Sequence, residues 1–296
     1  MIPTTENEKH SGGRWDRTFA PMTDSTFSRL ASFIHAELGI KMPDVKKSML
    51  QGRLQKRMRR LGLGSYEEYV QYVFTPEGVE QELPQLINSV TTNKTDFFRE
   101  PKHYEVLVRQ VLPHVVDLSS AGLKRKLKVW SAACSTGEEP YTLAMVLSEF
   151  GETCPGFHFS ILATDISTKV LEKAMTGIYG EEKIEPVPSP LRKKYLLRGK
   201  DGKRGLVRIV PELRSLVRFQ RLNLMENDYG LREAIDVIFC RNVIIYFDRP
   251  TQKKVLGRLI AYLRPGGYLF MGHSETLNGF NMPLAPIALT VYRKTE

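Results

Sequence analysis

The sequence predicts an α/β protein with a mostly parallel sheet, a small all-helical domain before it and a small antiparallel β insertion within it. The sheet is predicted by short apolar or alternating runs at 126–134, 157–165, 235–242 and 266–272, which alternate with helical stretches. The helical domain is predicted by residues 24–90, where apolar side chains recur at helical spacing and no strand pattern intervenes.

We expect a flexible tail at 1–20 and the helical domain at 21–90. Residues 24–26 form a capping signal ahead of a helix whose one face carries Phe27, Leu30, Ile34 and Leu38. The next helix is basic over 46–60, with lysine or arginine at 46, 47, 53, 56, 57, 59 and 60. This basic helix is either a solvated charged face or a docking surface for an acidic partner.

The composition limits which class of protein this can be and in which cellular compartment it is expected. The 296 residues are 42% hydrophobic and carry a net charge of +10, which indicates a globular protein with an acidic partner such as nucleic acid, an anionic membrane or an acidic protein face. The three cysteines are widely spaced and the histidines lack metal-ligand spacing, so we expect no metal site and a reducing cytoplasm. No apolar run approaches the roughly 20 residues of a membrane span, so no membrane insertion is expected.

The stretch "SAACSTGEEPY" at 131–141 follows the first predicted strand, where doubly wound folds bind nucleotides. It has a single glycine, but its other small side chains also let a ligand approach the backbone closely. Glu138 and Glu139 open the next helix, and they would repel phosphates but attract a cationic ligand such as a sulfonium. The alternative, which this stretch leaves open, is a plain loop whose acids stabilise a helix start.

Polar residues follow other predicted strands at the same edge of the sheet. Asp165 ends the second strand, where a carboxylate can bind ribose hydroxyls or simply cap the next helix. Arg241 follows a later strand, with Tyr246 one turn beyond, and Asn223 and Leu224 follow another apparent strand end. The first strand, the small-residue turn, the helix, the second strand and its terminal Asp165 together favour an adenosine site more strongly than either part does alone.

Two segments lie outside this alternation. Residues 91–100, "TTNKTDFFRE", suit a domain junction anchored by phenylalanines, with Arg99 as a cation beside them. Residues 177–222 are too long for an ordinary connection of about 2–6 residues. They contain two or three short strands, so we expect an antiparallel insertion there.

Taken together, the stretches "TTNKTDFFRE", "WSAACSTGEEPYTLAM", "ATDIS", "LNLMEND", "FCRNVIIYFD" and "LRPGGYLFMGHSE" resemble the bacterial chemotaxis receptor methyltransferases of the CheR family. The resemblance runs in order from about residue 24 to 293. It implies a class I S-adenosylmethionine-dependent methyltransferase fold, Rossmann-like, for 91–296. It also implies a reaction in which glutamate side chains of chemoreceptors become γ-methyl esters during chemotaxis adaptation, with S-adenosylhomocysteine as the second product.

The resemblance also implies which residues form the site. Arg241 and Tyr246 lie beside the transferred methyl, and we expect Arg241, with Arg99, to orient the substrate carboxylate while Tyr246 positions it. Because glutamate has a pKa near 4.3, the substrate is already a nucleophile at neutral pH and no general base is needed. Which glutamate of the 138–139 pair meets the cofactor stays open. The implied cofactor contacts are Asn93, Thr95, Arg99, Glu138, Glu139, Asp165, Asn223, Leu224, Cys240 and Arg241.

The implied partners are the acidic methylation helices of chemoreceptors, docked by the basic helix 46–60. Some family members bind a receptor C-terminal tether peptide on the inserted subdomain, and the sequence of 177–222 leaves this open. We expect a cytoplasmic monomer with no nucleic-acid partner. Two rival functions are a methyltransferase acting on nucleic acid and a non-catalytic module that senses S-adenosylmethionine.

Overall fold

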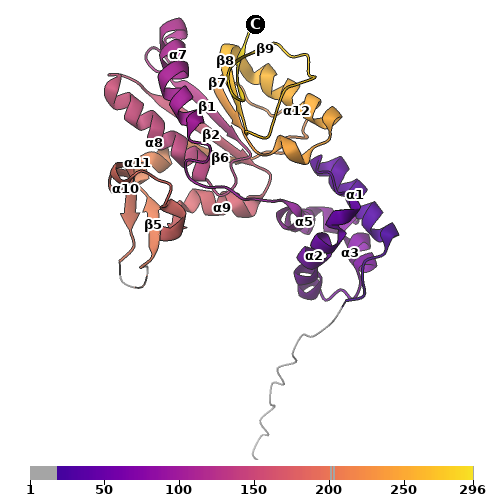
Figure 1. Ribbon diagram of the computed structural model, residues 1–296. Helices are drawn as coiled ribbons and strands as arrows, with labels where there is room; N and C mark the ends of the chain where they lie inside the picture. The colour runs from indigo at the N-terminus through magenta and orange to yellow at the C-terminus, as the bar shows by residue number, and fades with distance from the viewer. Residues whose placement is uncertain (1–18, 201, 203, 296) are drawn as a thin grey trace, which may run out of the picture.

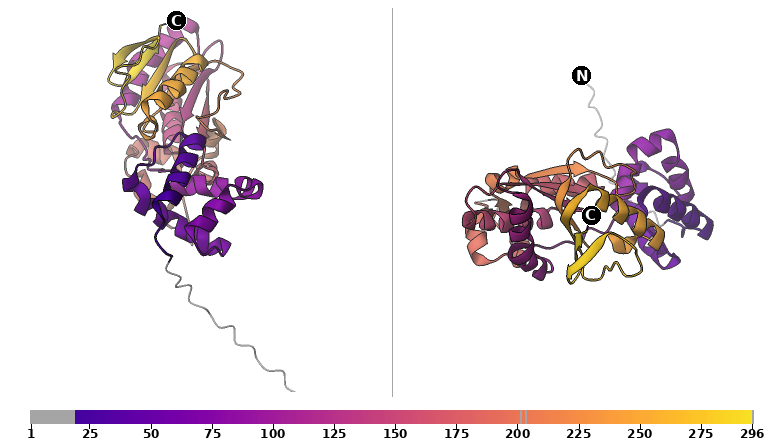
Figure 2. Two further views of the ribbon diagram at one scale, coloured as in Figure 1. Left: turned by 90° about the vertical axis from the view of Figure 1, so that its right-hand side faces the viewer. Right: turned by 90° about the horizontal axis from the view of Figure 1, so that it is seen from above.

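The computed structural model describes residues 19–200, 202 and 204–295, and most of the predicted tail, residues 1–18, lies outside them. The described chain forms a helical domain, a domain built on a large sheet and a small antiparallel subdomain. The helical domain and the small subdomain lie on opposite sides of the molecule (Figures 1 and 2). No helix among the described residues is long and apolar enough to cross a membrane.

The helical domain forms because each of its helices buries one apolar face. Helix α1 is capped by the Thr23 side chain and buries Leu30 and Ile34, as its spacing predicts. The basic helix, α2, buries Leu50, Leu54 and Met58 and ends at Gly62 in the left-handed conformation. The helices are α1 (Asp24–Leu38), η1 (Asp44–Lys46), α2 (Lys47–Leu61), α3 (Tyr66–Val73), α4 (Pro76–Gln81) and α5 (Leu83–Val90).

The large sheet is mostly parallel, as the sequence predicts. Its seven strands have the order β6-β2-β1-β7-β8-β10-β9, and the first five are parallel to one another. The predicted last strand is instead a hairpin of two strands, whose second member runs antiparallel to β8. The strands are β1 (Leu127–Ala132), β2 (Phe159–Asp165), β6 (Val217–Arg221), β7 (Ile235–Cys240), β8 (Leu263–Met271), β9 (Leu284–Ala288) and β10 (Val291–Lys294).

Helices cover both faces of this sheet, which explains its nearly continuous apolar strands. Helix α8 packs against one face, where Val129 and Phe239 are buried, and α12 packs against the other, where Trp130 and Ile238 are buried (Figure 1). Helices α6 and α7, joined by a π-helical turn, are a stretch that the sequence patterns did not predict. The covering helices are α6 (Lys102–Val106), η2 (Leu107–Val111), α7 (Leu112–Ser119), α8 (Glu138–Thr153), α9 (Thr168–Thr176) and α12 (Arg249–Tyr262).

The insertion is an antiparallel sheet of three strands in the order β3-β5-β4, as expected. It ends earlier than predicted, because β6 pairs with β2 as the parallel edge strand of the large sheet. A strand at the edge of an α/β sheet and a strand of a small hairpin look alike in sequence, since only their pairing partners differ. The subdomain contains β3 (Ile178–Gly180), η3 (Glu181–Ile184), α10 (Ser189–Tyr195), β4 (Leu196–Arg198), β5 (Leu206–Ile209) and α11 (Pro211–Ser215).

Candidate functional site

A cavity of about 220 Å³ lies between the helical domain and the carboxyl ends of the parallel strands. This edge of an open α/β sheet is where ligands bind, because loops from several strands meet there. Nine of the predicted site residues line the cavity: Asn93, Thr95, Arg99, Glu139, Asp165, Asn223, Leu224, Arg241 and Tyr246. The remaining two are buried elsewhere, Glu138 under the loop after β1 and Cys240 in the core on the α12 face.

The loop between β1 and α8 folds tightly without several glycines. Ala133, Ser135 and Gly137 all have positive φ angles, of 66°, 50° and 97°. Only the last of these must be glycine, because a Cβ there would lie 2.8 Å from the hydroxyl of Tyr179. The short side chains of the other two let the backbone line the cavity, which is the role the sequence predicted for them.

The structure separates the two glutamates that open α8. Glu138 is 1% exposed, and its carboxylate accepts a hydrogen bond of 2.6 Å from the Thr136 hydroxyl. Glu139 lines the cavity and accepts a hydrogen bond of 2.7 Å from the Ser131 hydroxyl. Burial raises the pKa of the Glu139 carboxyl, and the nearby Arg241 opposes this. Glu139 is therefore the one of the pair placed to meet a ligand.

Asp165 is fixed in place by backbone amides of two loops. Its carboxylate accepts hydrogen bonds of 2.9 Å from the amides of Ser135 and Ser167. Burial raises the pKa of this carboxyl, while the amides favour its charged form. The acid thus joins the loops after β1 and β2, and it has acceptor capacity left for a ligand hydroxyl.

Arg241, which the sequence analysis expects to orient the substrate carboxylate, is engaged by other groups of the protein. Its guanidinium donates to both Glu100 (2.9 Å) and Glu139 (3.2 Å), and also to the hydroxyl of Tyr104 and the carbonyl of Arg99. These four bonds use all four N–H groups on Nη1 and Nη2. Burial disfavours ionisation of Glu100, but Arg241 and the hydrogen bonds from His273 and Asn242 together outweigh burial. The pKa of this carboxyl therefore lies below its usual value. Arg241 thus holds Glu139 at the cavity wall.

Tyr246 lies in the short helix η5 (Ile244–Tyr246), which follows β7. The buried carboxylate of Glu275 anchors this segment, accepting hydrogen bonds from the amides of Ile244 (2.8 Å), Asn242 (2.8 Å) and Gly272 (2.7 Å). The segment that carries the tyrosine is therefore attached to the loop after β8.

The helical domain contributes part of the cavity wall through residues that the sequence analysis did not assign to the site: Leu38, Ile40, Met42, Lys46 and Met49. Backbone contacts join this wall to the strand ends. The amide of Lys41 donates to the carbonyl of Tyr246 at 2.9 Å, and the side chain of Asn223 donates to the carbonyl of Glu37 at 2.8 Å. The helical domain is thus a structural part of the site.

The basic helix α2 has two kinds of cation. Arg57 pairs with the carboxylate of Glu82, which is 1% exposed, and Arg53 donates to carbonyls at the end of α5. Lys56, Arg59 and Arg60 are exposed. The exposed cationic face of the basic helix is therefore smaller than its sequence suggests, because Arg53 and Arg57 face the domain core.

Several residues of the site were missed for identifiable reasons. Tyr104 lies on α6, which the sequence patterns did not predict, and it stacks on Phe239 beside the Arg241 guanidinium. Glu100 and Glu275 lie within stretches that carried the family resemblance, but nothing local shows which groups they contact. Ser135 lies in the stretch 131–141, where the sequence shows only that its side chain is small.

Two family models match the chain in the order of its domains. The all-alpha domain of CheR methyltransferases matches residues 25–91, and the SAM-binding domain of CheR methyltransferases matches residues 93–293. The chain belongs to the CheR methyltransferase family. The cavity described above lies where the two matched CheR domains meet.

Curated relatives are similar over nearly their whole length. The chain is 41% identical over 273 residues to chemotaxis protein methyltransferase 2 of Pseudomonas aeruginosa, covering 91% of this chain and 93% of that one. It is 38% identical to the chemotaxis protein methyltransferase of Borreliella burgdorferi (92% and 95%). It is 39% identical to that of Escherichia coli (92% and 91%).

Proposed function

We propose that this CheR family member transfers the methyl group of S-adenosylmethionine to glutamate carboxylates of chemoreceptors, giving γ-methyl esters and S-adenosylhomocysteine. The observation that carries the proposal is the convergence of the predicted residues on one cavity, in a chain that matches both CheR domains. The relatives named above are chemotaxis protein methyltransferases. Neither rival, a nucleic-acid methyltransferase or a non-catalytic sensor, is favoured by these matches.

The donor set of the cavity fits S-adenosylmethionine. Three carboxylates, those of Asp96, Glu139 and Asp165, line the cavity beside small, apolar and four cationic side chains. Glu139 and Asp165 lie at the strand ends, where two carboxylates suit a cationic ligand with a ribose. We propose that Asp165 accepts hydrogen bonds from the ribose hydroxyls and that Glu139, held by Arg241, meets the cationic amino-acid end. The cofactor supplies an electrophilic methyl carbon bound to sulfonium sulfur. The remaining predicted contacts, among them Asn93, Thr95, Asn223 and Leu224, line the same wall.

The substrate carboxylate would meet Arg99 and Tyr246. Both line the cavity, and among the described residues the guanidinium of Arg99 makes one hydrogen bond, of 3.1 Å, to the carbonyl of Lys94. Since the Nη groups of Arg241 are already engaged, Arg99 is better placed to orient an incoming carboxylate. A new O–C bond forms as the S–C bond breaks, and the substrate oxygen is already ionised at neutral pH. Holding the reacting atoms in line supplies the catalysis, worth up to about 7–11 kcal/mol.

Docking would use the exposed cations of α2. Lys56, Arg59 and Arg60 present positive charge that complements the acidic faces of a receptor bundle. A receptor tether could extend the small antiparallel sheet at one of its edge strands, β3 or β4. We further propose that the enzyme works as a monomer in the cytoplasm, where these receptor segments lie.

A methyl-transfer assay tests the function. The purified full-length chain is incubated with tritiated S-adenosylmethionine and a receptor methylation-helix fragment, and base-labile volatile label is counted. A matched fragment with its glutamates replaced by alanine, and an RNA of similar charge, serve as controls. Label in the first fragment alone is expected, because carboxyl methyl esters hydrolyse in base. Non-volatile label that precipitates with the RNA, or cofactor binding without any transfer, would instead support one of the two rivals.

A further inference from the structure

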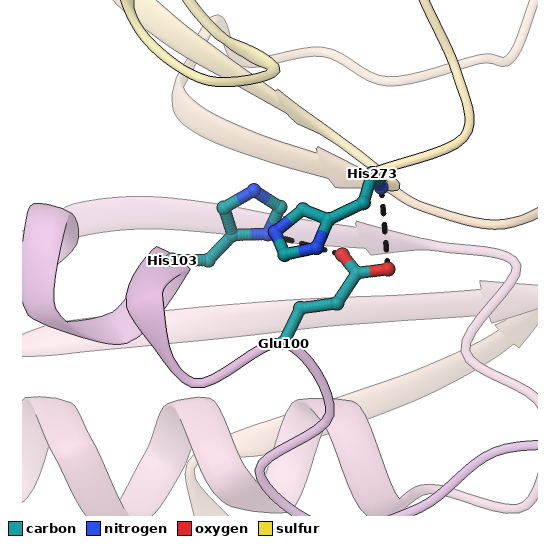
Figure 3. Close-up of side chains that lie close together, drawn as sticks. All are labelled: Glu100, His103 and His273. Carbon is teal, nitrogen blue, oxygen red and sulfur yellow. Dashed lines mark hydrogen bonds and ion pairs between the residues drawn. The ribbon is translucent and has the colours of Figure 1, made fainter.

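Glu100, His103 and His273 form a cluster beside the cavity without lining it. Glu100 precedes α6, His103 lies in α6, and His273 follows β8 after a gap of 170 residues in the sequence, from 103 to 273. Figure 3 shows the two imidazole rings and the carboxylate converging. One potential ligand atom from each residue lies within 4.8 Å of the other two.

His103 presents an unpartnered nitrogen to this cluster. The residue is 2% exposed, and its Nε2 lies 3.0 Å from the Thr290 hydroxyl. Within the described part of the chain, its Nδ1 is buried without a hydrogen-bond partner, and it lies 3.4 Å from Oε2 of Glu100. A partner at Nε2 fixes the ring orientation and leaves the Nδ1 lone pair for a ligand, as in histidine metal sites. A buried polar atom without a partner is otherwise costly.

The spacing suits a tetrahedral ion. Ligand atoms about 2.0–2.1 Å from a tetrahedral Zn²⁺ lie roughly 3.3 Å from one another. The 3.4 Å between His103 Nδ1 and Glu100 Oε2 already matches this spacing. His273 is exposed, so its ring can move inward to complete the set, and the solvent side is open to a water as fourth ligand.

The chemistry of the donors favours one class of cation. Two imidazoles and one carboxylate suit Zn²⁺ and its first-row neighbours, whereas Mg²⁺ and Ca²⁺ prefer oxygen ligands. The charges allow a cation despite the nearby arginine. Arg241 contributes +1, while its partners Glu100 and Glu139 contribute −1 each, which leaves a net charge of −1.

The cluster shares a carboxylate with the active site. Oε2 of Glu100, the atom nearest His103, also accepts the 2.9 Å hydrogen bond from Arg241. Oε1 of the same carboxylate is held by the amide of His273 (3.2 Å) and the side chain of Asn242 (3.3 Å). An ion on Oε2 would therefore compete directly with the guanidinium that holds Glu139 at the cavity.

We propose that Glu100, His103 and His273 form a binding site for Zn²⁺ or a similar transition-metal ion, and that its occupation loosens Arg241 and inhibits methyl transfer. The inhibitory part rests on the proposed function, whereas the site itself does not. Sequence spacing could not reveal this site, because its ligands meet only through the packing of α6 against the end of β8.

Zinc binding to the full-length chain tests the site. A Cys154→Ser background removes the half-buried thiol as a competing ligand. Calorimetry with ZnCl₂ at pH 7.5 is expected to give one ion per chain, and Co²⁺ is expected to give the visible absorption of a four-coordinate ion. His273→Ala should weaken binding at least ~10–100-fold, since even outer-shell partners are worth that much. The matched control is His158→Ala, another exposed histidine, which should leave binding unchanged. Equal affinity in the His273→Ala protein, or no binding at all, would overturn the site.

A second readout tests the coupling. Methyl transfer by the Cys154→Ser protein is measured with and without saturating Zn²⁺, and a loss that EDTA reverses is expected. For the His273→Ala protein, the ratio of the methyl-transfer rates with and without Zn²⁺ should be closer to one. Zinc binding without any change in methyl transfer would overturn the proposed inhibition, while the metal site itself would still be supported. A protein that never methylates receptor counts against the proposed function, and its zinc affinity can still be measured.

Discussion

Replacing Glu275 with Gln would remove half of the anchor that holds the segment from Arg241 to Tyr246. The carboxylate is 3% exposed and accepts amide hydrogen bonds at both oxygens. Oε1 accepts from Ile244 and Ile245, and Oε2 accepts from Asn242 and Gly272. In glutamine one oxygen becomes an NH₂ group, which cannot accept a hydrogen bond from the two amides that face it.

The cost follows from those two amides. A buried donor left without a partner costs about 1–3 kcal/mol, so two donors cost about 2–6 kcal/mol. This is a large share of the roughly 5–15 kcal/mol that stabilises a typical domain. We also expect a higher KM for receptor, because Tyr246 and the neighbouring cavity wall lose their fixed position.

Urea unfolding followed by circular dichroism measures the first effect, and methyl-transfer kinetics on the folded protein measure the second. Glu172→Gln, a change of the same chemistry at an exposed position on α9, is the matched control and should stay within about 0.5 kcal/mol of the parent. If Glu275→Gln also stays within that limit and keeps its KM, the anchoring argument is refuted.

Five further substitutions test roles that the structure assigns to individual residues. Glu139→Gln should weaken S-adenosylmethionine binding by about tenfold or more, as expected for losing a hydrogen bond of a charged group. Glu138→Gln should leave the affinity for S-adenosylmethionine, measured by calorimetry, nearly unchanged. Equal losses of affinity in the two variants would contradict the different roles assigned to the two glutamates. Arg57→Ala should cost about 3–5 kcal/mol in urea unfolding because it leaves a buried carboxylate unpaired. Arg60→Ala should instead lower receptor kcat/KM at low salt with little change in stability, and a salt-independent effect would argue against docking. Because burial raises the folded-state pKa of Asp165, the folded protein binds its proton more tightly than the unfolded chain. The stability of the parent protein should therefore fall as pH rises from about 4 through that raised pKa. Asp165→Asn lacks this proton, so its stability relative to the parent should rise over the same pH range. A constant difference between the two urea midpoints would refute this last point.

Local patterns were sufficient for the parts of the fold whose causes are local. The spacing of Leu30 and Ile34, the cap at Thr23 and the left-handed Gly62 mark helix faces and ends in α1 and α2. The site residues Asp165 and Arg241 were also predictable, because each ends or follows a strand and parallel strands end at one edge of the sheet.

What the sequence missed depends on contacts between distant segments. The ion pairs of Arg241 join three segments that are distant in sequence, so spacing could not show whether its guanidinium is available to a substrate carboxylate. The inward direction of Arg53 and Arg57 was partly predictable, since each directly precedes a buried residue of α2, Leu54 or Met58. The pairing of β6 with β2 had no local signal that distinguishes it from the insertion strands.

If the helical domain docks the receptor as proposed, the hydrogen bonds from Lys41 to Tyr246 and from Asn223 to Glu37 would link receptor docking to cofactor binding thermodynamically. One domain would dock the receptor, yet the same domain closes the cavity over the strand ends. By reciprocity, a receptor that binds one arrangement of the helical domain more tightly must change the affinity for S-adenosylmethionine by the same factor that the cofactor changes the affinity for receptor. A single enzyme would then respond to receptor occupancy and to the ratio of S-adenosylmethionine to its product as one combined signal.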